Sequence, residues 1–178
     1  MATPARFRFA AKAQRSAAAG LVTGRSADIG WLTDPYRAFG ERLGVILLGI
    51  PDPIVRDDER LVALLDAWPT DLPLALELGH SSWHVDETFQ ALTAHGVALA
   101  ATERPDDMEP PTIRRTAPLL YLRLRRHDYE DREIAGWAAR IAPFLDDGVD
   151  VYAFLRHDET GRATELATRL SEEVSRRR

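Results

Sequence analysis

The stretch from residue 43 to residue 78 decides the fold. It reads Leu43-Gly-Val-Ile-Leu-Leu-Gly-Ile50, then a helical pattern from Asp57 to Trp68, then Leu74-Ala-Leu-Glu-Leu78. The two outer segments are short, apolar and rich in residues that favour strands. The middle segment repeats its apolar residues at helical spacing, at Leu61, Leu64, Leu65 and Trp68. A strand, a helix and a strand in this order predict a right-handed βαβ unit and therefore a parallel sheet.

The same alternation continues in both directions along the chain. Apolar, β-rich segments predict six strands in all, at Phe7 to Ala13, Val45 to Ile50, Leu74 to Leu78, Val97 to Ala101, Leu119 to Leu124 and Val151 to Leu155. Helical patterns predict helices at Asp34 to Leu43, Asp57 to Trp68, Val85 to His95, Glu130 to Leu145 and Thr160 to Arg177. The segment between Ala101 and Leu119 is rich in proline, which predicts a loop with at most a short helix.

Six parallel strands are compatible with two architectures. One is an open, doubly wound sheet, and the other is part of an eight-stranded barrel. No glycine-rich phosphate-binding fingerprint follows any predicted strand, which weakens the nucleotide-binding form of the open sheet. We find no linker and no shift in composition, so we expect a single domain.

Composition excludes several classes of protein. The 178 residues contain no cysteine, which rules out disulfides, thiolate metal sites and cysteine nucleophiles. The net charge of −5 makes a nucleic-acid partner unlikely, because nucleic-acid binders usually carry a basic excess. No apolar run reaches the roughly 20 residues that span a bilayer, and the first residues do not resemble a secretory signal, so we expect no membrane partner and a cytoplasmic protein.

Several blocks of the chain resemble the YecE-like family. The segment Leu76-Glu-Leu-Gly-His-Ser-Ser-Trp83 resembles the family's Glu-x-Arg-His-x-Ser-Trp at the end of a strand. Thr3-Pro-Ala-Arg-Phe-Arg-Phe-Ala-Ala-Lys12 and Leu43-Gly-Val-Ile-Leu-Leu-Gly-Ile-Pro51 resemble two further family blocks, as do Tyr121-Leu-Arg-Leu124 and Val151-Tyr-Ala-Phe154. The resemblance implies a (β/α) barrel of the triosephosphate-isomerase type. The six strands would then be strands three to eight of a single domain over residues 1–178 that lacks the first two strands.

The chain departs from the family motifs at several polar positions. Gly79 stands where the family motif has arginine, and Gly49 stands where it has glutamine. The family's His-Gly after the seventh strand is Arg125-Arg126 here, and the asparagine-rich end of its last strand reads Leu155-Arg156-His157. These changes suggest a degenerate paralogue as an alternative to an active member of the family.

Three charged residues are expected to face the axis of the barrel. Side chains alternate between the two faces of a strand, so the leucines at 74, 76 and 78 would face the helices while Glu77 faces inward. The same alternation points Lys12 and Arg123 inward. Lys12 is the only lysine among 23 basic residues. Two cations that share one carboxylate leave an excess positive charge, which favours an anion site; a buried ion-pair layer without a ligand is the alternative.

Further candidates lie just beyond the strand ends, where barrels of this type form their active sites. His80 matches the family histidine, and with Glu77 it forms the candidate acid–base pair; the alternative is a loop histidine that caps the next helix. Trp83 and Arg125 are further candidate ligand-binding residues. We predict no metal site and no cofactor, since the pair His80 and His84 lies in an expected loop. His157-Asp158-Glu159 is read as the cap of the last helix.

The sequence therefore leaves two hypotheses about function. The first is a protein that binds a small anionic or phosphorylated ligand at the C-terminal mouth of the barrel, with or without catalysis. The second is a non-catalytic interaction module that completes its sheet by association, as a homo-oligomer or with a strand-supplying partner. Neither the substrate nor the reaction follows from the sequence.

Overall fold

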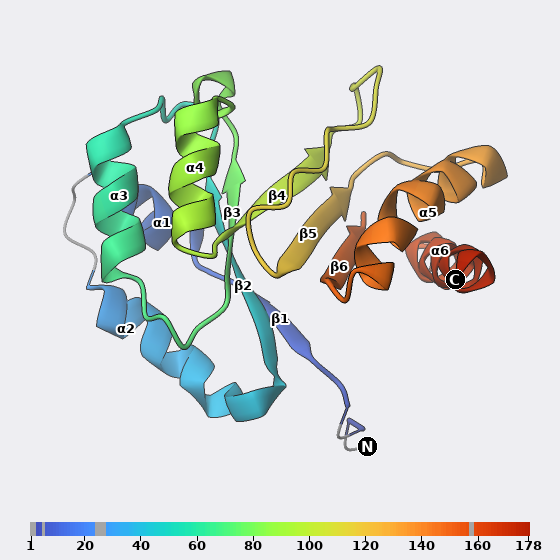
Figure 1. The fold of residues 1–178 in the computed structure, drawn as a ribbon, viewed down its shortest axis with the longest axis horizontal. Coiled ribbons are helices and arrows are strands. Elements are labelled where there is room, and N and C mark those ends of the chain that lie inside the picture. Colours follow the sequence, from blue (N-terminus) through green and yellow to red (C-terminus); the bar gives the residue numbers. More distant parts are fainter. Residues whose placement is uncertain (1–2, 5, 24–27, 157–158) are drawn as a thin grey trace. The chain divides into compact units, whose positions relative to one another are not determined.

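The computed structural model describes residues 3–4, 6–23, 28–156 and 159–178 (Figure 1). Six parallel strands pair with one another in chain order, from β1 to β6, and helices connect most of them. Parallel strands in chain order with intervening helices are the topology of a TIM-type (β/α) barrel, here incomplete with six of the eight strands. The predicted fold class is confirmed. The chain forms two compact units, residues 1–99 and 100–178, and the division falls within β4.

The first unit contains three complete strands and their helices. The strands are β1 (Phe9–Lys12), β2 (Leu43–Ile50) and β3 (Leu74–Leu78), and β4 (Ala98–Glu103) begins here. The helices are α1 (Arg15–Thr23), α2 (Ile29–Thr33), α3 (Asp58–Ala67) and α4 (Asp86–Ala94), with 3-10 helices η1 (Asp34–Arg42) and η2 (Ser81–Trp83).

The core of the first unit lies between the strands and their helices. Ile46, Leu48 and Ile50 of β2 pack in one buried cluster with Leu61 and Leu64 of α3. The leucines at 74, 76 and 78 of β3 belong to the same cluster, so they face the helices as the alternation predicted. The residues between them in sequence therefore face the opposite side of the sheet.

The second unit repeats this arrangement with two helices. It contains the end of β4, β5 (Leu119–Leu124), α5 (Asp131–Asp146), β6 (Asp150–Leu155) and α6 (Arg162–Arg177). Leu122 and Leu124 of β5 pack against Ile134 and Trp137 of α5 and Leu166 of α6. The proline-rich segment after β4 contains no helix, as predicted.

The structure contains three helical elements between β1 and β2, of which the sequence predicted only one. Helices α1 and α2 were not predicted, although Asp28 caps α2 by accepting hydrogen bonds from the backbone of Gly30 and Trp31. The predicted helix from Asp34 to Leu43 is η1, a 3-10 helix that is interrupted at Gly40, where φ is +53°. Glycine adopts this left-handed conformation at little cost, so Gly40 ends the helical path before β2.

No helix among the described residues is both long enough and apolar enough to cross a bilayer.

Candidate functional site

Lys12 and Glu77 lie on the same face of the sheet in the first unit. Lys12 is the last residue of β1 and pairs in register with Leu47 of β2, while Glu77 of β3 pairs with Gly49. Partners in register on parallel strands point to the same side, and this side is opposite to the one that packs on the helices. Gly49 contributes no side chain, and the Glu77 Oε2 atom lies 3.5 Å from the position that a Cβ atom at Gly49 would occupy. The half-buried Glu77 carboxylate therefore extends toward the space that a side chain at position 49 would occupy.

Gly79 cannot accept a side chain in this backbone. A Cβ atom there would lie 2.6 Å from Asp52 Oδ1, 2.8 Å from the Asp52 backbone nitrogen and 3.0 Å from the Ile50 carbonyl oxygen. The Gly79 N–H also donates a 2.9 Å hydrogen bond to that carbonyl. The loop after β2 thus occupies the space into which the arginine of the family motif would project.

His80 caps the short helix η2. Its Nδ1 atom accepts a hydrogen bond of 3.1 Å from the Ser82 backbone N–H and lies 2.8 Å from Ser82 Oγ. An Nδ1 atom that accepts from a backbone N–H places the ring proton on Nε2 in the neutral imidazole. The capping alternative is therefore realised, and Nε2 is the atom of His80 with which a ligand would interact. The acid–base role of Glu77 and His80 stays a prediction.

Trp83 packs in the core of the first unit rather than at an open surface. Its side chain is 0% exposed, and its indole N–H donates a 2.9 Å hydrogen bond to the Ile54 carbonyl oxygen. A ligand cannot reach the ring in this conformation, so we assign Trp83 a packing role and leave it out of the proposed site. His84 likewise uses Nε2 to donate to the Leu78 carbonyl oxygen, at 3.0 Å.

Strands β5 and β6 of the second unit present a ladder of aromatic and basic side chains on one face. Tyr121 pairs with Tyr152 and Arg123 pairs with Phe154. The Arg156 N–H continues the ladder with a 2.9 Å hydrogen bond to the carbonyl oxygen of Leu124, the last residue of β5. Because Leu124 pairs with Leu155, the next residues along the two strands, Arg125 and Arg156, are neighbours.

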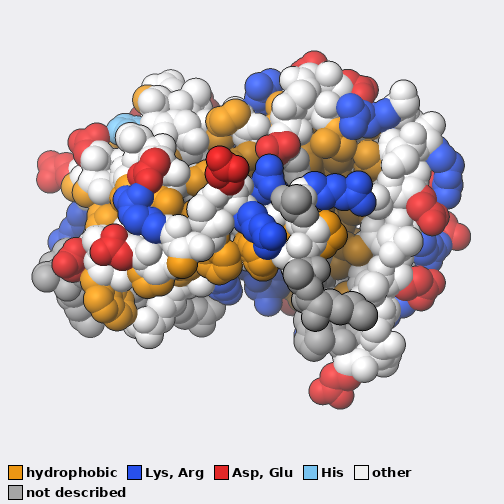
Figure 2. Space-filling view, turned by 90° about the horizontal axis from the view of Figure 1, so that it is seen from below, with side chains coloured by type: hydrophobic (Ala, Val, Ile, Leu, Met, Phe, Trp, Pro, Cys, Tyr) orange, Lys and Arg blue, Asp and Glu red, His pale blue; other side chains and the backbone are white. Residues whose placement is uncertain are grey.

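All of these side chains lie on the face opposite to α5 and α6. Leu122 and Leu124, which alternate with them along β5, belong to the cluster that packs on the helices. The rings of Tyr121 and Phe154 stack with centroids 5.1 Å apart and planes inclined by 27°. The two arginines thus follow an aromatic pair at the carboxyl ends of the strands. On the face of the molecule drawn in Figure 2, hydrophobic side chains also reach the surface between basic side chains.

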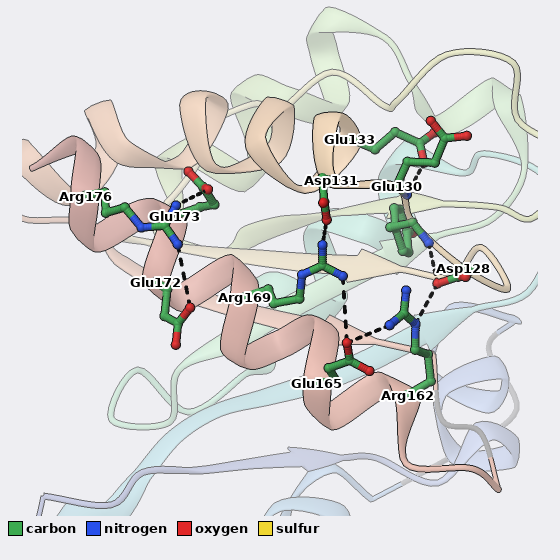
Figure 3. Close-up of polar contacts among 11 residues, drawn as sticks. Asp128, Glu130, Asp131, Glu133, Arg162, Glu165, Arg169, Glu172, Glu173 and Arg176 are labelled. Atoms are coloured by element: carbon green, nitrogen blue, oxygen red, sulfur yellow. Dashed lines mark hydrogen bonds and ion pairs between the residues drawn. The ribbon is translucent and has the colours of Figure 1, made fainter.

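Most arginines near α5 and α6 are neutralised by carboxylates, as Figure 3 shows. Arg162 contacts Asp128 at 3.0 Å and Glu165 at 2.8 Å, and Arg169 contacts Asp131. These pairs tie the start of α6 to the start of α5 and to the loop before it. The guanidinium of Arg162 is also the main reason why the pKa of Asp128 lies below its usual range.

Arg125 and Arg156 differ from these arginines. Within the ranges that the structure describes, neither has a carboxylate within 4 Å. Arg156 instead donates from Nη1 to His127 Nε2, at 3.1 Å. An arginine has only donors, so His127 accepts with Nε2 and is the neutral tautomer in this contact. Arg126, between them in sequence, pairs with Glu133 at 2.6 Å and has a structural role.

A buried carboxylate lies on the helix side of the same unit. Glu103, the last residue of β4, is 2% exposed and accepts a short hydrogen bond from the Tyr129 hydroxyl. Burial, and next the bond to Glu103, raise the pKa of Tyr129 well above its usual value. Arg140 stacks on Trp137 at 4.4 Å, and its pKa is lowered by burial and raised in part by Glu103. These contacts fix the end of β4 to α5 and do not open to a ligand.

The predicted convergence of Lys12, Glu77 and Arg123 involves both units, and it stays a prediction. The described residues contain no group of three or more metal-ligating side chains placed to hold a metal ion. His157 and Asp158 lie outside the described residues. Sequence reasoning placed Arg125 in the site but missed Arg156. The signal was present, because both arginines directly follow the last residue of neighbouring predicted strands.

Comparisons with known proteins agree on the family and the fold. A family model described as "Protein of unknown function DUF72" matches residues 1–178. The structure resembles that of a DUF72 family protein from Enterococcus faecalis V583, with a TM-score of 0.79 and 20% identity over 97% of this chain and 80% of that one. It also resembles a DUF72 family protein from Thermotoga maritima MSB8, with a TM-score of 0.72 and 20% identity over 97% of this chain and 75% of that one. No curated protein matches the chain.

Proposed function

This chain belongs to the DUF72 family, the family that the sequence resemblance identified as YecE-like, and we propose that it binds a small anionic ligand through arginines at the carboxyl ends of β5 and β6. One observation carries the proposal. Arg125 and Arg156 are neighbours in the β5–β6 ladder, and neither has a carboxylate partner among the described residues.

Two adjacent guanidinium groups without a counter-charge are unfavourable by themselves. Neighbouring strands lie about 4.8 Å apart, so two arginine side chains that start from neighbouring positions concentrate positive charge at this point. An anion between them reverses this repulsion, and guanidinium groups match the oxygens of phosphate, sulfate or carboxylate in bidentate geometry. The carboxyl ends of parallel strands are also where barrels of this type bind their ligands.

The contact from Arg156 to His127 supports this role. It holds the Arg156 guanidinium by Nη1 and leaves its other nitrogen atoms available as donors. Arg123 lies half-buried on the same face, two residues before Arg125. The roles that the sequence predicts for Lys12 and Glu77 stay predictions about the first unit.

The experiment is thermal unfolding of the protein with inorganic phosphate, sulfate and small dicarboxylates. A ligand at 100 times its dissociation constant should stabilise the folded protein by about 2.7 kcal/mol. We expect Arg125→Gln and Arg156→Gln each to reduce this effect strongly. Arg176→Gln is the matched control, because Arg176 pairs with Glu173 far along α6. The proposal fails if no anion shifts the wild-type transition, or if the two arginine variants respond like wild type.

A second candidate function rests on the edge of β1. Among the described residues β1 pairs only with β2, and an exposed edge strand can accept another strand. Phe7 and Phe39 are partly exposed beside this edge, and each ring lies 4.9 Å from Phe9. An interaction module would use this edge to bind a partner strand or a second copy. Light scattering after size-exclusion chromatography tests it: a monomer at all concentrations would exclude self-association.

A further inference from the structure

We infer that the ligand of the β5–β6 site is a phosphate monoester that carries a planar ring, with the phosphoryl group between Arg125 and Arg156 and the ring stacked on Phe154. The inference rests on the proposed anion site and adds the class of ligand. It starts from the order of the side chains along the ladder: an aromatic row, then a row with Arg123 and Phe154, then the two arginines.

Under this inference, a ligand ring stacks on the face of Phe154 that Tyr121 does not cover. The other face of Phe154 is covered by Tyr121, whose ring stacks on it at 5.1 Å. Phe154 lies on β6, an edge strand of the sheet among the described residues, and its side chain is 39% exposed. A planar ring on the face of Phe154 opposite to Tyr121 would extend the stack from two rings to three. Stacking of this kind accepts aromatic and heteroaromatic rings alike, because each has a π-face.

The spacing along the strand indicates how ring and phosphate are joined. The row of Phe154 precedes the row of Arg156 by two residues, which is about 6.6 Å along a strand. A phosphate attached directly to a ring is shorter than this, whereas one sugar ring between them spans it. A nucleoside 5′-monophosphate has this layout, and phenyl phosphate has the same two groups without the spacer.

Charge favours a small molecule over a nucleic-acid strand. The chain has a net charge of −5, whereas proteins that bind nucleic acids usually carry a basic excess. Two arginines can bind a single phosphate group, but a strand would need basic side chains along its whole path. We therefore assign the site to a monomeric phosphate ester.

The test compares inorganic phosphate, phenyl phosphate and a nucleoside 5′-monophosphate by isothermal titration calorimetry. We expect the nucleoside monophosphate to bind about tenfold more tightly than inorganic phosphate, which corresponds to about 1.4 kcal/mol. Phe154→Leu should abolish that gain and leave the affinity for inorganic phosphate unchanged. Phe154→Tyr keeps the ring and should keep the gain. Circular dichroism establishes that each variant is folded.

Each outcome decides one of the two proposals. Equal affinity for inorganic phosphate and the nucleoside monophosphate, or a gain that survives in Phe154→Leu, overturns the stacking inference and leaves the anion site standing. Phenyl phosphate that binds as tightly as the nucleoside monophosphate overturns the spacing argument. A single-stranded oligonucleotide that binds more tightly than the monophosphate overturns the assignment to a small molecule. Binding of every phosphate compound that persists in Arg125→Gln and Arg156→Gln overturns the anion site itself.

Discussion

Replacing Gly79 by alanine tests whether the loop after β2 has closed over the position of the family's motif arginine. The added Cβ atom would lie within 3.0 Å of three atoms, two of which belong to the backbone of Asp52 and Ile50. The Asp52 carboxylate can rotate away at little cost, but the backbone atoms can move only if β2 or its loop shifts. Forcing an extra methyl group into such a packed region costs typically 1–3 kcal/mol. For a chain of this size that corresponds to a fall of roughly 2–12 °C in the midpoint of thermal unfolding.

The matched control is Gly136→Ala on α5. No atom lies within 4 Å of the position of its Cβ, and alanine in the interior of a helix is favoured over glycine by up to about 1 kcal/mol. We expect urea unfolding, followed by tryptophan fluorescence, to show a lower midpoint for Gly79→Ala and an equal or higher midpoint for Gly136→Ala. A Gly79→Ala protein as stable as wild type would refute the close approach of the loop. It would also reopen the possibility that this position accepts the family's arginine.

Three further predictions concern stability. The hydrogen bond from His95 to a backbone carbonyl of α4, and next the one to Asp66, raise the pKa of His95. Protonated His95 therefore stabilises the fold fully below pH about 6.5, and this stabilisation is lost as the pH rises through the raised pKa. Urea unfolding midpoints of wild type and His95→Gln should therefore converge at alkaline pH, and a gap that stays constant with pH would contradict this. Tyr129→Phe leaves the buried Glu103 carboxylate without its hydroxyl donor and should lower the free energy of unfolding by about 1–3 kcal/mol, whereas an unchanged value would mean that the bond contributes nothing. Asp57→Ala removes the side chain that caps α3 and should cost about 1 kcal/mol, measured in the same way; a loss that Asp57→Asn does not largely restore would contradict a capping role.

Most of the fold follows from the sequence because its strands are short apolar runs with clear helical segments between them. The bounds of β3 and β5 agree with the predicted residues, and the other strands differ from them by one or two residues at an end. Helix α1 escaped prediction because its alanine-rich sequence has no alternation between apolar and polar residues. Helix α2 has only five residues, too few for a periodic pattern, and its one signal was the capping residue Asp28.

For the candidate site, the sequence predicted only which face of a strand each side chain occupies. Alternation along a strand placed Glu77 and Arg123 on the face away from the helices, and the buried clusters bear this out. It could not show that Trp83 turns into the core, because the path of a loop depends on tertiary packing. It could not show the steric closure at Gly79 either, since that closure comes from Asp52, 27 residues earlier in the chain.

The changes from the family motifs differ in kind between the two halves of the chain. In the first half, the resemblance sets Gly79 and Gly49 against an arginine and a glutamine of the family motifs, so polar groups are absent there. In the second half, it sets Arg125-Arg126 against His-Gly and Leu155-Arg156-His157 against an asparagine-rich segment, so basic side chains are present there. Under the proposal, an anion that binds between Arg125 and Arg156 offsets the repulsion between their like charges. The proposed anion site lies at the ends of β5 and β6, where Arg125 and Arg156 place their donors.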